Sequence, residues 1–128
     1  MADMQSALRA RIVAALPHGR VYWASAPQGS VLPYVRLATV SDPRPLVLKG
    51  YRAFRETGVQ VDVFARGYGE ARGQAEAIIT ALLDPVTVDG VRFGPCRAEG
   101  PRDLGEDVPG SGYIHRASVD LLVWHSST

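Results

Sequence analysis

The chain has 128 residues, of which 46% are hydrophobic and 21% charged, and we expect one folded domain spanning residues 1–128 rather than a disordered chain. Fourteen Lys and Arg against 13 Asp and Glu give a formal net charge of +1, which excludes the strongly basic balance of a dedicated nucleic-acid-binding domain. The single cysteine, Cys96, excludes an intrachain disulfide and is typical of a reducing compartment. The longest apolar run near the N-terminus, Ile12 to Leu16, falls far short of the roughly 20 residues of a spanning helix, so no membrane contact is expected.

The first predicted elements are a helix and two strands. Apolar residues at helical spacing predict an amphipathic helix over residues 4–16, which Pro17 and Gly19 end. The β-prone residues that follow predict strands over residues 20–24 and 34–40, separated by a Pro- and Gly-containing turn.

A basic loop and a third strand follow. Pro43 and Pro45 interrupt regular structure, so the segment from Asp42 to Gly58 predicts an irregular or extended loop. Alternation of Val59, Val61 and Val63 with Gln60 and Asp62 predicts a half-buried strand over residues 59–64. A strand with one polar face is typical of an antiparallel sheet.

The second half predicts one helix, a hairpin, a long loop and a last strand. Apolar residues at three-and-four spacing predict a helix over residues 68–83, and Asp89-Gly90 predicts a tight hairpin turn. The Gly- and Pro-rich segment 94–112 predicts a long loop, and the alternating residues 113–124 predict a strand. This order predicts an α+β fold with a mostly antiparallel sheet and two main helices packed on one face.

No residue pattern predicts a cofactor site. Gly67, Gly69 and Gly73 resemble part of a dinucleotide fingerprint, but Arg72 occupies the position where the third glycine belongs. A flexible turn between a strand and a helix accounts for these glycines, so we expect no bound cofactor.

Metal binding and nucleophilic catalysis also lack the required residues. His18, His115 and His125 form no pair at ligand spacing, and the acidic residues near position 105 lack the spacing of a calcium loop. Cys96 stands beside Arg97 but has no base that the sequence identifies. We therefore expect neither a metal site nor an enzyme.

Two charged segments are the candidate protein-contact surfaces. Segments 42–58 and 94–112 are long and charged and lack a core pattern, and the first also carries aromatic side chains. The near-neutral total charge favours contact with protein over contact with phosphate. The candidate interface residues are Arg44, Lys49, Tyr51, Arg52, Phe54, Arg55, Arg97, Arg102, Asp103, Glu106 and Asp107.

The order and spacing of several segments resemble the tail-completion or tail-terminator proteins of long-tailed bacteriophages and of related prophage or gene-transfer particles. The resemblance covers nearly the whole chain. It is carried by Ala7-Leu8-Arg9-Ala10, Gly19-Arg20-Val21-Tyr22, Ala26-Pro27-Gln28-Gly29, Leu32-Pro33-Tyr34-Val35, residues 59–65, Glu70-Ala71-Arg72, residues 116–121 and Val123-Trp124.

The resemblance implies a structural virion protein at the junction of head and tail, present in the host cytoplasm during assembly. Such a subunit is expected to form a ring of six copies that caps the tail tube and ends its polymerisation. The implied partners are the chain itself, the tail tube protein and a head-tail connector or stopper protein. DNA would pass through the ring without sequence-specific binding.

Three other functions compete with this interpretation. A different connector or stopper protein of the neck would share the same small α+β pattern. A host ligand-binding α+β domain would need a closed apolar pocket with converging polar groups. An enzyme would need a cleft that holds a histidine or cysteine with a perturbed pKa.

Overall fold

A computed structural model of the chain describes residues 3–42, 55–110 and 112–127. Its elements in chain order are α1 (Met4–Ala15), β1 (Val21–Trp23), β2 (Tyr34–Ser41), β3 (Arg55–Ala65), α2 (Tyr68–Ala81), β4 (Val86–Val88), β5 (Val91–Phe93), β6 (Arg97–Val108) and β7 (Gly112–Ser127). The predicted helices, hairpin and last strand are confirmed, with their ends shifted by a few residues.

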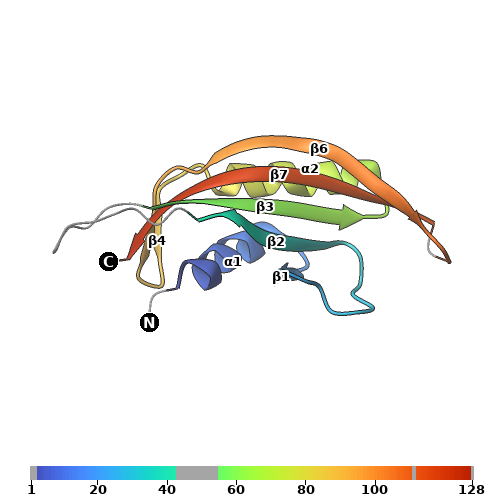
Figure 1. The fold of residues 1–128 in the computed structure, drawn as a ribbon, viewed down its shortest axis with the longest axis horizontal. Helices are drawn as coiled ribbons and strands as arrows, with labels where there is room; N and C mark the ends of the chain where they lie inside the picture. Colours follow the sequence, from blue (N-terminus) through green and yellow to red (C-terminus); the bar gives the residue numbers. More distant parts are fainter. Residues whose placement is uncertain (1–2, 43–54, 111, 128) are drawn as a thin grey trace.

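Among the described residues, seven strands form one curved sheet (Figure 1). The order is β1-β2-β3-β7-β5-β4, and β6 pairs with the same edge of β7 as β5 does, farther along the strand. β1 and β2 are parallel, whereas the other pairs are antiparallel. The central pair β3 and β7 runs from Arg55 opposite His125 to Ala65 opposite His115. The α+β fold with a mostly antiparallel sheet is therefore confirmed.

Both helices pack on one face of this sheet. The core is one cluster that joins the inner side chains of α1 and α2 to alternate residues of the central strands, such as Val61 and Val119. α1 begins at Asp3, whose Oδ1 accepts a hydrogen bond from the backbone N of Gln5 at 3.1 Å. Burial of this single apolar face is the main source of stability for a sheet that has helices on one side only.

The hairpin of β4 and β5 has the turn that its sequence predicts. Asp89 and Gly90 both adopt positive φ, at 49° and 80°. This geometry matches the twist of a two-residue hairpin, and Asp and Gly are among the residues that tolerate it.

The prediction of a long loop over 94–112 is wrong, because residues 97–108 form β6. No residue of β6 is buried. Its sequence therefore lacks the alternation of apolar and polar residues by which a half-buried strand is predicted. The proline and glycines fit an edge strand. Pro101 lies in the irregularity of register between Glu99 and Arg102, and Gly105 lies close to the backbone of β7.

Two other expectations need correction at β3. The predicted loop over 42–58 ends earlier, because Arg55 to Gly58 already belong to β3, and residues 43–54 lie outside the described residues. β3 is also more than half-buried, since Asp62 on its polar face is only 1% exposed. Long neighbouring side chains on the flanking strands cover this carboxylate, and nothing in the sequence alternation of β3 alone indicates that cover.

Candidate assembly surface

The face of the sheet opposite the helices, here called the open face, carries charged and aromatic side chains in cross-strand rows. One row runs from Arg36 through Asp62 and Ser118 to Arg102, across β2, β3, β7 and β6. The next row runs from Tyr34 through Phe64 and Arg116 to Leu104. The open face is therefore a continuous surface built by four strands.

Asp62 is the electrostatic centre of the open face. Its Oδ2 accepts a hydrogen bond from Arg36 at 2.9 Å, and Gln60 Nε2 lies within 3.2 Å of both carboxylate oxygens. Arg116 Nε lies 3.9 Å from Asp62 Oδ1 and is buried with no hydrogen-bond partner. Two guanidinium groups thus converge on one buried carboxylate, and both remain about one-third exposed, at 34% and 32%.

Aromatic rings lie beside this charged centre. Tyr34 stacks on Phe64 with ring centroids 4.8 Å apart, and Tyr22 meets Tyr34 edge to face at 6.2 Å. The Arg36 guanidinium lies over the Phe64 ring at 5.2 Å. These contacts hold the arginine side chain in one place, which prepares it to bind a partner with little further loss of entropy.

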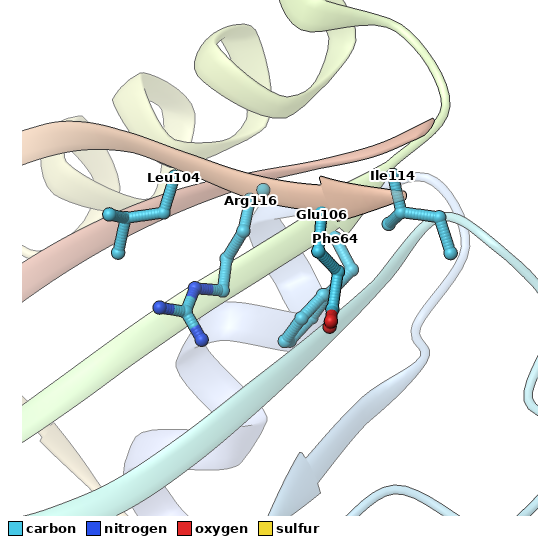
Figure 2. A pocket seen from close by; sticks show the side chains of 6 residues that line it. Phe64, Leu104, Glu106, Ile114 and Arg116 are labelled. Atoms are coloured by element: carbon cyan, nitrogen blue, oxygen red, sulfur yellow. The ribbon is translucent and has the colours of Figure 1, made fainter. Parts of the chain in front are cut away.

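A shallow pocket of about 260 Å³ lies next to Phe64 at the β6 side of the open face (Figure 2). Leu104 and Ile114 stand at opposite sides of it, and the Glu106 carboxylate and the Arg116 guanidinium project into the same space. A pocket with apolar walls and one group of each charge suits a protein side chain better than a closed small-molecule site.

Two of the candidate residues from the sequence, Asp103 and Arg102, attach β6 to α2 and to β7 respectively. Asp103 accepts hydrogen bonds from Tyr68 at 3.1 Å and from Arg72 at 3.2 Å. The hydrogen bond to Asp103 is the main cause that raises the pKa of Arg72. Arg102 instead pairs with Asp120 on the open face. Both ion pairs hold β6 within the subunit.

The remaining candidate residues do not come together as one site. Arg44, Lys49, Tyr51, Arg52 and Phe54 lie outside the described residues. Arg55 pairs with Asp42 at 2.6 Å. Arg55 lies opposite His125, near one end of β7. Glu106 and Asp107 lie opposite Ile114 and Tyr113 at the other end of β7, and Arg97 is exposed between these positions.

The polar network around His125 lies beside Arg55. Thr57 Oγ1 lies 2.8 Å from His125 Nε2 and donates to Asp42 Oδ1 at 3.2 Å. Burial lowers the pKa of His125, and the Arg55 guanidinium lowers it further, whereas Asp42 acts in the opposite direction. The arrangement favours the neutral imidazole and a structural role.

Cys96 is buried and packs against Arg11. Burial raises the pKa of the Cys96 thiol, although the Arg11 guanidinium acts in the opposite direction. A buried thiol with a raised pKa is a poor nucleophile.

Arg102 and Glu106 of the open face were among the candidates that the sequence provided, whereas Arg36, Asp62, Phe64 and Arg116 were not. The alternation of β7 does place Arg116, Ser118 and Asp120 on one face, and that of β3 places Gln60 and Asp62 together. The missing information was the pairing of these strands, which brings separate polar residues into rows.

Among residues 3–42, 55–110 and 112–127, no group of three or more His, Cys, Asp or Glu side chains could hold a metal ion. Within the same residues, neither helix has the length and apolar character needed to cross a membrane.

An α+β subunit with an uncovered, charged sheet face belongs to the class of assembly proteins rather than to that of closed ligand-binding domains. The family model described as Tail completion protein gp17 matches residues 2–126. The chain belongs to this family, and it is a structural protein of a phage-type tail.

Solved structures provide a second comparison. One chain from the "Virion of native gene transfer agent (GTA) particle" is similar to this chain, with a TM-score of 0.54 and 14% identity, over 99% of this chain and 98% of that chain. A second solved chain, known only by a sequence number, has a TM-score of 0.59 and 13% identity, over 98% of this chain and 94% of that chain. At these identities both similarities concern the fold alone. Comparison with curated proteins gave no significant match.

Proposed function

We propose that the chain caps the tail tube as a ring of six copies, ends tube polymerisation and provides the surface to which the head connector or stopper binds. Membership in the tail completion family over residues 2–126 is the observation that carries this proposal. The similar chain in a gene transfer agent virion supports a place in the particle itself. In this arrangement DNA passes through the ring without sequence-specific contacts.

The distribution of charged and aromatic side chains supports assembly rather than catalysis. The open face offers Arg36, Arg116 and Phe64, which are groups that protein interfaces favour. The residues Arg44, Lys49, Tyr51, Arg52 and Phe54 form a second proposed contact, because they join basic and aromatic side chains in a short segment.

A polymerisation assay tests this proposal. Purified tail tube protein is allowed to elongate, and the chain is added during growth. The proposal predicts that elongation stops and that tube lengths become fixed at the moment of addition. Continued growth in the presence of excess chain, or binding to head connectors without binding to tubes, would instead assign the chain to another position in the neck.

A separate variant tests the second proposed contact, which includes Lys49 and Arg52. Replacing Lys49 and Arg52 with Glu should leave the fold unchanged, because charged side chains are seldom buried in a core, and should weaken the arrest of elongation. Circular dichroism and the elongation assay together check this result. Replacing Glu70 and Glu76 of α2 with Lys is a matched control on exposed positions. Unchanged arrest by the Lys49 and Arg52 variant would remove this segment from the interface.

A further inference from the structure

One long edge of the sheet carries negative charge that no ion pair within the described residues compensates. Of the six charged residues on β6, Arg102 pairs with Asp120 and Asp103 pairs with Arg72. The other four are exposed and form no ion pair with a described residue. They are Arg97, Glu99, Glu106 and Asp107, three carboxylates against one guanidinium.

The opposite edge carries fixed positive charge. Arg9 on α1 donates from Nε to the backbone O of Val21 at 2.8 Å. Arg20, just before β1, donates from Nε to the backbone O of Val31 and of Pro33 at 3.1 and 2.9 Å. Neither guanidinium forms an ion pair within residues 3–42, 55–110 and 112–127. The nearby carboxylate of Asp3 caps α1, where the positive end of the helix dipole offsets its charge.

These two edges lie on opposite sides of the molecule. β1 is the last strand on one side of the sheet, and β6 is the outermost strand beside β7 on the other (Figure 1). β6 presents 12 residues, none of them buried, and its outer edge pairs with no described strand. A long exposed edge strand favours unselective pairing unless charges or a partner protect it. A partner with a positively charged surface would cover the exposed edge of β6 and neutralise its negative charge.

We propose that the acidic β6 edge of one copy docks against the basic edge of a second copy, which Arg9 and Arg20 provide. This inference rests on the proposed ring, and it names the two surfaces that meet at each subunit contact. The contact is heterologous, because the two surfaces differ, and its repetition around an axis can close a ring. Opposite charges also orient the two copies during encounter and disfavour contacts between like edges.

Two charge-reversed variants test the docking. In the first, Glu106→Lys and Asp107→Lys make the β6 edge basic. In the second, Arg9→Glu and Arg20→Glu make the other edge acidic. Each variant alone then brings like charges together. We expect its self-association, measured by native mass spectrometry at low salt, to be about tenfold weaker or more. An equimolar mixture should restore rings in which the variants alternate, because each altered edge then meets an edge of opposite charge.

Controls keep the result interpretable. Glu70→Lys with Glu76→Lys adds the same charge as the first variant at exposed positions of α2, outside both edge strands, and should leave association unchanged. Arg9→Glu with Gln28→Glu replaces the second variant if loss of the Arg20 hydrogen bonds unfolds it, since Gln28 is exposed in the loop that follows β1.

Unaltered rings from either variant alone, failure of the mixture to associate, or a wild-type chain that stays monomeric at high concentration and low salt would overturn the docking proposal. Arrest of tube elongation is measured separately. A chain that arrests tubes without this contact would retain the proposed function and lose only the inferred interface.

Discussion

At the scale of single residues, Asp62 holds the open face together. Its buried carboxylate compensates the charge of Arg36 and approaches that of Arg116, so its removal leaves two guanidinium groups facing each other. We expect Asp62→Ala to lower the free energy of unfolding by about 2 kcal/mol, less than for a fully buried pair, because both arginines reach water. Urea denaturation measures this loss.

Asp120 provides the matched control for Asp62. Its ion pair with Arg102 is exposed on both sides, at 42% and 47%, and water screens it. Asp120→Ala should therefore cost less than Asp62→Ala. Equal losses for the two variants would contradict the central role of Asp62.

His125 makes stability depend on pH. Because folding lowers its pKa below the value of about 6.5 in the unfolded chain, the unfolded state binds more protons in acid. The stability that the neutral imidazole provides is complete above pH 6.5 and decreases as the pH falls below it. Thermal melting should therefore occur at a lower temperature at pH 5.5 than at pH 7.5. His125→Gln should reduce this difference, and an unchanged difference would exclude His125 as its source.

At the scale of elements, two glycines should respond oppositely to the same substitution. A Cβ at Gly105 in β6 would lie 2.7 Å from the backbone O of Ile114, so Gly105→Ala forces β6 away from β7 and should cost about 1–3 kcal/mol. A Cβ at Gly73 in α2 meets nothing within 4 Å, and Gly73→Ala should stabilise the helix by about 1 kcal/mol. Chemical denaturation of both variants checks the signs, and two changes of the same sign would contradict the close packing of β6.

The success of sequence-based prediction follows the burial of each element. α1, α2, β3 and β7 each bury residues at regular spacing, such as Ala71, Ala75 and Ile78 in α2, and the spacing identifies them. β6 buries nothing, so only its pairing with β7 defines it as a strand. The cross-strand rows of the open face escaped prediction for a related reason, because residues such as Arg36, Asp62 and Ser118 become neighbours only after three strands have paired.

At the scale of the whole molecule, the two faces of the sheet have different roles. The helix face contains the core and stabilises the subunit, whereas the open face and the β6 edge leave charged groups available for contact. A subunit of a phage-type tail requires both features, a rigid body and more than one surface for neighbours. In the proposed ring, the charge difference between the β6 edge and the edge formed by α1 and β1 would give each subunit the polarity that a closed ring of identical contacts requires.

Cryo-electron microscopy of tail tubes incubated with the chain tests the central claim most directly. We predict a ring of six copies at one end of each tube and bare walls elsewhere, with β6 of each copy against the α1 and β1 side of the next. Tubes with both ends bare at saturating concentrations of the chain, or copies bound along the walls, would contradict the proposal that this protein completes the tail.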